Sequence, residues 1–313
     1  MTSSLARRRL PLLAAAGALG GLALVNRAHA EQAKRDHPPI GRFIEVGGTR
    51  LHVLERGSGP PILLVHGNGT MIEDWIISGV LDDLAKTNRV IAVDRPGFGH
   101  SDRPRGTRWS VKRQAALMAE TLRLLDAEQA VAVGHSFGAL VTAALALNHP
   151  ERLRGIALLG GYYYPSARAD VLLVAPSAIP GVGDVLRHTF MPLLGQALRP
   201  RFNAKLFGPA KPTQAWLDLF PWAMALRPSR VRAGAADAVQ MVPSAAGLVP
   251  RYKEIELPVA ILAGRDDRMV NTGAQSERLH SALPHSRLHL IDGIGHMIHH
   301  NAPKEVAAAI RLI

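Results

Sequence analysis

The sequence predicts an α/β protein, built as a doubly wound and mostly parallel sheet with an inserted helical cap. Short, continuous apolar runs bounded by glycine, proline or polar residues recur along the chain, which is typical of strands buried on both faces. Segments with apolar residues at helical spacing lie between these runs. One proline-rich stretch, residues 161–250, carries no strand pattern and interrupts the alternation. At 313 residues and 47% hydrophobic, the chain is long enough for one large core with such an insertion.

Residues 1–30 are predicted to be a targeting segment that lies outside the fold. Three arginines at positions 7–9 precede an uncharged apolar run, residues 10–25, and Ala28-His29-Ala30 fits a small-x-small cleavage site. As a helix, that run would span about 24 Å, less than the roughly 30 Å of hydrocarbon in a bilayer. We therefore expect a signal peptide and an exported protein, periplasmic or secreted. The alternative is a membrane anchor formed by residues 10–25.

Residues 40–160 are expected to form the first part of the core, after a polar linker. Residues 43–46 and 51–54 alternate in polarity around Gly47-Gly48 and predict a hairpin. Buried-strand patterns follow at residues 62–65, 90–93, 130–133 and 156–159. Between the second and third of these, Ser110 is suited to cap a helix that continues to Leu125.

Residues 161–250 are expected to form the helical cap, and residues 251–313 the second part of the core. The recurring prolines of the cap segment favour short helices that are joined at the prolines. Inserted between two strands, the segment would cover the carboxyl edge of the sheet, where α/β proteins bind ligands. Strand patterns resume at residues 259–262 and 288–291, and a helix is expected over residues 304–312.

Composition excludes several classes of function. The chain has no cysteine, so disulfides, thiolate metal sites and a cysteine nucleophile are all ruled out. Its formal charge is +12, but the basic residues are scattered and no nucleic-acid-binding motif accompanies them. We expect no nucleic-acid partner, and the sequence leaves the oligomeric state open.

The segment VGHSFGA places Ser136 between two glycines at the end of a buried strand, just before helix-compatible sequence. A sharp strand-to-helix turn lifts the serine hydroxyl clear of the sheet, and Gly134 and Gly138 let neighbouring backbone approach closely. A flexible turn would also use glycines, but this strand–turn–helix context favours a nucleophile. Ser136 is therefore the predicted nucleophile.

A serine hydroxyl needs a base to accept its proton. His296 follows the last strand pattern in a glycine-flanked loop, and Asp267 follows the strand pattern at residues 259–262. Strand ends at one sheet edge can converge, and the order serine, aspartate, histidine is the one expected for this architecture. We predict His296 as the base and Asp267 as its partner. The alternatives nearby are Asp266 for the aspartate, and His299 or His300 for the base.

Acyl transfer also requires hydrogen-bond donors for the developing oxyanion. The glycine-rich segment HGNGT follows the strand pattern at residues 62–65 and can turn sharply. The backbone N–H groups of Asn68 and Phe137 are the predicted pair of donors. A simple turn without a catalytic role is the competing interpretation of this segment.

Five motifs together resemble the α/β-hydrolase fold superfamily, in its order and spacing, over about residues 40–313. They are ILLVHGNGT, DRPGFGHSDRP, VGHSFGA, LAGRDD and GIGHMIHHNAP. The nearest branch is the capped group of esterases, lipases, carbon–carbon hydrolases, epoxide hydrolases and dehalogenases. The resemblance implies that dehalogenases and epoxide hydrolases carry aspartate at the nucleophile position, so Ser136 argues against both activities.

The expected activity is a serine hydrolase that cleaves carboxylic esters of small apolar substrates through an acyl-enzyme, with no metal or organic cofactor. A carbon–carbon bond hydrolase or a cofactor-free perhydrolase would use the same three side chains and stays open. A catalytically idle protein that binds an apolar ligand is an alternative from a different class, and a role at the membrane surface through the basic N-terminus is another.

Overall fold

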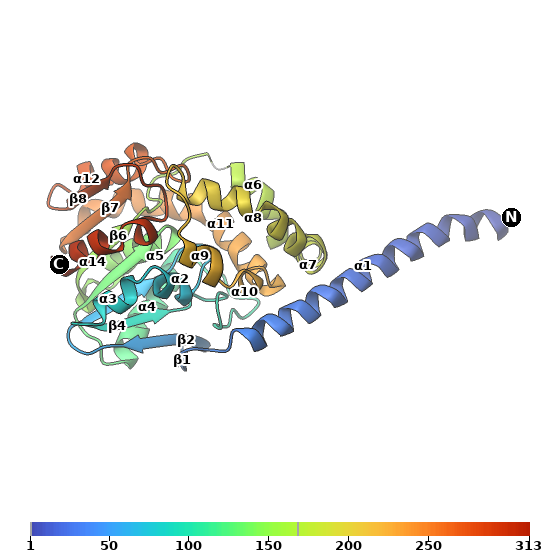
Figure 1. The fold of residues 1–313 in the computed structure, drawn as a ribbon, viewed down its shortest axis with the longest axis horizontal. Helices are drawn as coiled ribbons and strands as arrows, with labels where there is room; N and C mark the ends of the chain where they lie inside the picture. Colours follow the sequence, from blue (N-terminus) through green and yellow to red (C-terminus); the bar gives the residue numbers. More distant parts are fainter. Residues whose placement is uncertain (1, 168) are drawn as a thin grey trace.

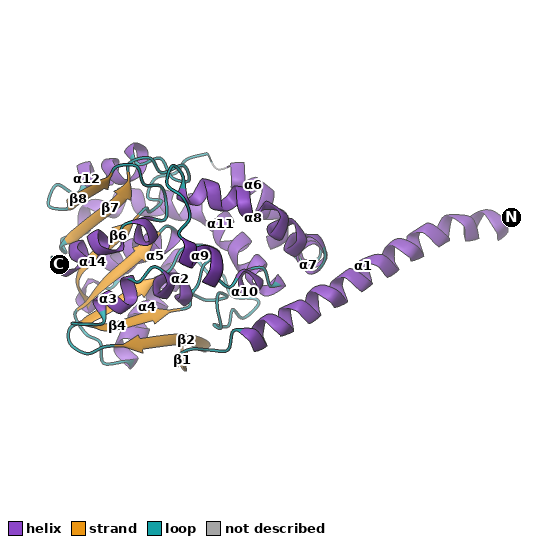
Figure 2. Ribbon diagram, viewed as in Figure 1, coloured by secondary structure: helices purple, strands orange, loops and turns teal. Residues whose placement is uncertain are grey.

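In the computed structural model, which describes residues 2–167 and 169–313, the chain forms an eight-stranded sheet with helices on both faces (Figures 1 and 2). The strand order is β1-β2-β4-β3-β5-β6-β7-β8. The strands are β1 (Arg42–Val46), β2 (Thr49–Arg56), β3 (Pro61–Val65), β4 (Arg89–Val93), β5 (Ala130–His135), β6 (Leu153–Leu159), β7 (Val259–Gly264) and β8 (Arg287–Ile291).

All strands from β3 to β8 pair in parallel, and only β2 is antiparallel to its neighbours β1 and β4. The predicted α/β class, the hairpin and the six further strands are therefore confirmed, although β8, at the edge of the sheet, is only partly buried. Antiparallel pairing at this edge follows from the hairpin, because two strands joined by a two-residue turn must run in opposite directions.

Two apolar cores lie on the two faces of the sheet. Along β5, Ala130 and Ala132 pack into one core with α4 (Val111–Leu124) and α5 (Phe137–Asn148), while Val131 and Val133 pack into the other. This alternation is what a strand covered on both sides requires. The helices that supply the second core or flank the last strands are α2 (Ile72–Ile77), α3 (Val80–Leu84), α12 (Arg278–Ala282), α13 (Ile298–Asn301) and α14 (Pro303–Arg311).

The segment between β6 and β7 is helical and contains no strand in the residues that the structure describes, as predicted. Its helices are α6 (Ala169–Val174), α7 (Val182–His188), α8 (Phe190–Phe207), α9 (Gln214–Leu219), α10 (Trp222–Ala225) and α11 (Pro228–Leu248).

The expectation that prolines would divide this segment into short helices is wrong for two of its members. Helix α8 has 18 residues and continues through Pro200, and α11 has 21 residues and continues through Pro243. Both prolines are exposed, and so are Gln196 and Val239, four residues before them. Water can therefore bind the carbonyl that each proline leaves without its helical partner.

The N-terminus forms one helix, α1 (Thr2–Asp36), which projects away from the body of the molecule (Figure 1). The predicted polar linker after residue 30 is shorter than expected, because the helix continues through the proposed cleavage site. Its C-terminal turns contact the helical segment: the Asn26 amide donates to the carbonyls of His188 and Thr189, and Ala33 is buried. No helix in the described part of the chain is both long and apolar enough to cross a membrane.

Candidate active site

Ser136 occupies a strained backbone conformation at the turn from β5 into α5. Its φ and ψ angles are 54° and −117°, in the half of the Ramachandran plot with positive φ that residues other than glycine rarely adopt. Such strain persists only where the surrounding structure enforces it, and it concentrates at functional sites. The serine is half-buried, and its hydroxyl is available at the carboxyl edge of the sheet.

The two glycines that flank Ser136 are required by close packing. A Cβ atom at Gly134 would lie 2.4 Å from the Gly138 carbonyl oxygen, and one at Gly138 would lie 2.2 Å from the Val65 carbonyl oxygen. Both distances are far below van der Waals contact, and backbone atoms cannot move aside easily. The glycines therefore let α5 pack directly against β5 and β3 and hold the turn in place.

The structure brings the three predicted side chains into one hydrogen-bonded line. The Ser136 Oγ lies 2.9 Å from His296 Nε2, and His296 Nδ1 lies 2.7 Å from Asp267 Oδ2. The other Asp267 oxygen accepts hydrogen bonds from the backbone N–H groups of Met269, at 2.7 Å, and Val270, at 2.9 Å. The aspartate is thus fixed by its own loop, and it can hold the imidazole with Nε2 facing the serine.

The competing residues lie elsewhere. Asp266 is exposed and accepts a hydrogen bond from the Gly293 N–H group, so it does not reach His296. His299 and His300 are buried and both donate from Nε2 to Asp74 Oδ1, at 3.0 and 2.7 Å. The geometry therefore favours His296 over His299 and His300 as the base, and Asp267 over Asp266 as its partner.

The segment that carries Asn68 lies directly over the serine turn. A Cβ atom at Gly67 would be 3.1 Å from His135 Nδ1 and 3.3 Å from Ser136 Cβ, so this loop approaches the turn as closely as a glycine allows. Phe137 is the first residue of α5, and its N–H group has no partner within the helix. The Asn68 side chain donates to the Gly234 carbonyl of α11 at 3.0 Å.

Arg95, which the sequence analysis did not identify, fixes the loop that carries Asn68 through hydrogen bonds. Its guanidinium donates to the carbonyls of His66 and Gly67, at 2.9 and 3.0 Å, and to the carboxylate of Asp237 at 2.6 Å. Arg95 and Asp237 are fully buried. Burial, followed by the charge of Arg95, lowers the pKa of His66 to about 4, so His66 is neutral at pH 7 and its Nε2 accepts from the backbone N–H group of Arg95.

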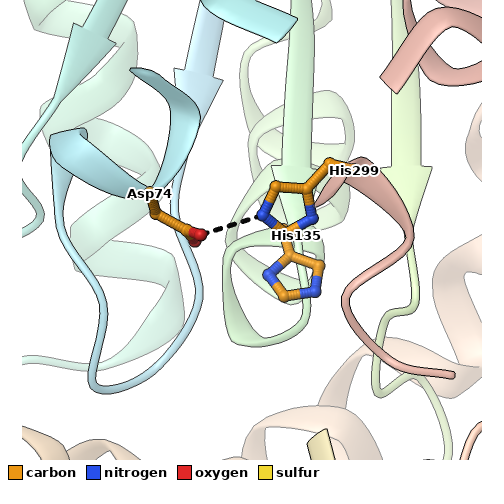
Figure 3. A group of neighbouring side chains, drawn as sticks. All are labelled: Asp74, His135 and His299. Carbon is orange, nitrogen blue, oxygen red and sulfur yellow. Dashed lines mark hydrogen bonds and ion pairs between the residues drawn. The ribbon is translucent and has the colours of Figure 1, made fainter. Parts of the chain in front are cut away.

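A buried histidine cluster, also missed, lies beside the loop of His296, and Figure 3 shows three of its members, Asp74, His135 and His299. It consists of Asp74, His135, His299 and His300, and the ring centroids of His135 and His299 are 4.4 Å apart. The centroid of the His135 ring also lies 4.9 Å from that of the His296 ring, and its Nε2 lies 3.1 Å from the His296 carbonyl oxygen. Burial, followed by the charges of His299 and His296, holds the pKa of His135 well below its usual range, so this ring is neutral.

Three members of this cluster also have the composition of a metal site. Asp74, His135 and His299 each offer a ligand atom within 4.8 Å of the others, and all three are buried. Two imidazoles and a carboxylate suit a first-row transition metal. However, Asp74 Oδ1 already accepts from two imidazoles. Although burial opposes ionisation of Asp74, those histidines hold its pKa well below the usual range. These hydrogen bonds hold the cluster together, while Asp74 Oδ2 and the Nδ1 atoms of His135, His299 and His300 are buried without a hydrogen-bond partner among the described residues. The adjacent pair His299-His300 is its only sequence signal.

Comparison with known proteins gives one family and several relatives. The family described as alpha/beta hydrolase fold matches residues 60–303. The 2-hydroxy-6-oxo-2,4-heptadienoate hydrolase of Pseudomonas putida is 28% identical over 264 residues, which cover 83% of this chain and 90% of the relative.

Two solved structures illustrate the likeness of fold. An esterase from Exiguobacterium antarcticum superposes with a TM-score of 0.71 at 19% identity, over 87% of this chain and 98% of its own. A bacterial membrane phospholipase A, described as a virulence factor, superposes with a TM-score of 0.67 at 23% identity, over 100% of this chain and 97% of its own.

Proposed function

This chain belongs to the α/β-hydrolase fold family and is a hydrolase, and from that premise we propose that it cleaves carboxylic esters of small apolar substrates through an acyl-enzyme. The observation that carries the proposal is the hydrogen-bonded line from the Ser136 hydroxyl through His296 to Asp267. Such a line turns a serine into a nucleophile near neutral pH.

In the proposed reaction, Ser136 Oγ attacks the ester carbonyl carbon while His296 Nε2 takes its proton. The N–H groups of Asn68 and Phe137 stabilise the oxyanion of the tetrahedral intermediate. His296 then donates the proton to the departing alcohol, which leaves an acyl group on Ser136. A water molecule, deprotonated by His296, attacks the acyl-enzyme and releases the acid. Asp267 orients the imidazole and stabilises its charged form.

Carbon–carbon bond hydrolysis is the second candidate, and the relatives favour it. The compound named for the Pseudomonas putida relative contains no ester, so hydrolysis of it must break a carbon–carbon bond next to a carbonyl. The same three side chains could serve that reaction. Ser136 argues against dehalogenation, because the family resemblance implies an aspartate nucleophile for that chemistry.

A substrate panel tests these alternatives. The purified chain is assayed with p-nitrophenyl esters of increasing acyl length and with a vinylogous diketone, next to the variants Ser136→Ala and Ser281→Ala. Ser281 is exposed and provides the matched control. Ester turnover that is abolished in Ser136→Ala and retained in Ser281→Ala supports the proposal. Turnover of the diketone alone supports the second candidate. A fluorophosphonate probe that fails to label Ser136, with no turnover of either class, would indicate an idle ligand-binding protein.

We also propose that the protein is exported from the cytoplasm and that its N-terminal helix is not cleaved. Asn26, on the amino side of the predicted cleavage site after Ala30, is buried in contacts with the segment between α7 and α8. Cleavage after Ala30 would remove these contacts, so they favour retention of the helix over its removal as a signal peptide. Mass spectrometry of the N-terminus of the protein, isolated from fractionated cells, tests both the processing and the location.

A further inference from the structure

A strongly cationic cavity of about 550 Å³ lies where α1, the loop after β4 and the start of α11 meet. It is separate from the proposed active site, because none of Ser136, Asp267 and His296 lines it. The basic residues in its wall are Lys34, Arg50, Arg103, Arg227, Arg230 and Arg232, and its acidic residue is Asp102.

Three arginines at the start of α11 form one wall of this cavity: Arg227 directly precedes the helix, and Arg230 and Arg232 lie in its first turns. Each uses a terminal guanidinium nitrogen to donate to a backbone carbonyl of the loop, and the acceptors are alternate residues. The pairs are Arg227 with Gly99 at 2.5 Å, Arg230 with Ser101 at 3.0 Å, and Arg232 with Arg103 at 2.9 Å. These bonds fix the arginines in place but leave most of their N–H groups for another acceptor.

None of these three arginines is in an ion pair with a described residue, and carboxylates such as Asp94 act on Arg227 and Arg230 only at longer range. The remaining cations of the wall have carboxylate partners: Lys34 pairs with Glu31, Arg50 with Asp102, and Arg103 with Asp237. By contrast, no carboxylate of a described residue lies within ion-pair distance of the three α11 arginines.

Burial makes this unpaired charge costly. Arg227 is only 4% exposed. The Nε of Arg230 is buried and finds no hydrogen-bond partner among the described residues. Burial, followed by the charge of Arg227, lowers the pKa of Arg230 to about 9. His100 adds no charge, because burial lowers its pKa to about 4. Adjacent, partly desolvated cations of this kind are expected to gain from a bound anion.

We propose that this cavity binds a phosphate group, carried by a small soluble molecule or by a lipid headgroup. Guanidinium groups bind phosphate oxygens through paired N–H groups, and several arginines around one site favour an anion with more than one charge. The amino end of the 21-residue helix α11 adds positive potential from the same side. This site is independent of ester hydrolysis, and Lys34 places it at the junction between α1 and the body.

Binding of inorganic phosphate is the first test. Titration of the full-length chain at pH 7 by calorimetry, with acetate as the monoanionic comparison, is repeated on Arg230→Gln, Arg230→Lys and Arg201→Gln. Arg201 is exposed on α8 and does not line the cavity, so it is the matched control. We expect Arg230→Gln to weaken phosphate binding about tenfold or more, Arg230→Lys to weaken it less, and Arg201→Gln to leave it within twofold.

Vesicles distinguish the two sources of the phosphate group. Phosphatidylcholine vesicles with or without phosphatidic acid are mixed with the wild type, Arg230→Gln and Arg201→Gln, and co-sedimentation is measured. Any binding through the N-terminal arginines is shared by all three proteins and cancels in the comparison. A loss confined to Arg230→Gln identifies a lipid headgroup as a ligand, whereas phosphate binding without this loss identifies a soluble one.

Circular dichroism and thermal unfolding of each variant verify that it is folded, and the wild-type titration does not depend on any variant. Absence of phosphate binding and of phosphatidic acid-dependent sedimentation by the wild type would overturn the proposal. Equal weakening in Arg230→Gln and Arg201→Gln would also overturn it, because binding would then reflect net charge alone.

Discussion

The buried ion pair between Arg95 and Asp237 is the interaction whose loss should cost the most stability. Asp237, on α11, accepts from Arg95 at 2.6 Å, from Arg103 at 2.8 Å and from Gln114 at 3.2 Å. The Arg95 and Asp237 side chains are fully buried, and that of Arg103 is 6% exposed. The substitution Asp237→Asn keeps the shape of the side chain but removes its charge.

Without that charge, the buried guanidinium of Arg95 keeps its hydrogen bonds to backbone carbonyls and loses its counter-ion. Removing one partner of a buried pair destabilises proteins by about 3–5 kcal/mol. We therefore expect Asp237→Asn to lower the free energy of unfolding by that amount, measured from the midpoint and slope of urea unfolding at pH 7.

The control is Asp82→Asn, which removes the carboxylate partner of Arg56 at the surface, where both side chains are at least 40% exposed. Its cost should stay below about 1 kcal/mol. If the two variants unfold at the same urea concentration with unchanged slopes, the buried pair does not carry the stability that its burial implies.

Three further substitutions test other features of the molecule. The free energy of unfolding of Ser136→Gly should be about 1 kcal/mol higher than that of Ser136→Ala, because glycine relieves the positive φ while both variants lose the hydroxyl. Equal urea midpoints for the two variants would argue against strain. Asp267→Asn should lower kcat by about 10³–10⁴-fold with little change in the fold, and near-normal kcat on the best p-nitrophenyl ester would exclude its role as orienting partner. Burial, followed by the charge of Asp94, raises the pKa of Glu73 to about 7 from its ordinary 4.5. The folded state therefore favours protonated Glu73, and the wild type loses stability as pH rises through this window. The substitution Glu73→Gln should thus gain up to about 3 kcal/mol by pH 8 and nothing near pH 4, and a gain independent of pH would contradict this.

Local sequence patterns were sufficient to predict the sheet and the proposed catalytic residues. Each buried strand is a short apolar run, and the parallel arrangement follows because both faces must be covered. Ser136, Asp267 and His296 could be grouped because each follows a different strand, and parallel strands end at the same edge. Ser110 also behaves as predicted, since its side chain accepts from the N–H group of Arg113 at the start of α4.

Contacts between distant segments could not be predicted from local sequence patterns. Asp74 meets His299 across 225 residues, and Arg95 meets Asp237 across 142. Nothing in the neighbourhood of either residue in the sequence indicates its partner. The helical prolines were misjudged for a related reason: a local rule assigns a cost to Pro200, but only the folded structure shows that Pro200 and Gln196, four residues before it, are exposed to solvent.

Helix α11 connects the features that local patterns missed. Within three turns, its arginines bind the loop after β4, its Gly234 carbonyl accepts from Asn68, and its Asp237 holds Arg95. Arg95 in turn binds the carbonyls next to Asn68. Lifting α11 from the sheet would separate a fully buried ion pair and release the loop that carries a predicted oxyanion donor.

Helices α6 and α7 are held less tightly. Large apolar side chains on them are exposed, among them Leu172 at 76% and Val182 at 57%. Elements with few buried apolar contacts open at lower free energy than those fixed by buried groups. Movement that admits an apolar substrate is therefore expected in α6 and α7, while α11 stays attached and keeps Asn68 in place above Ser136.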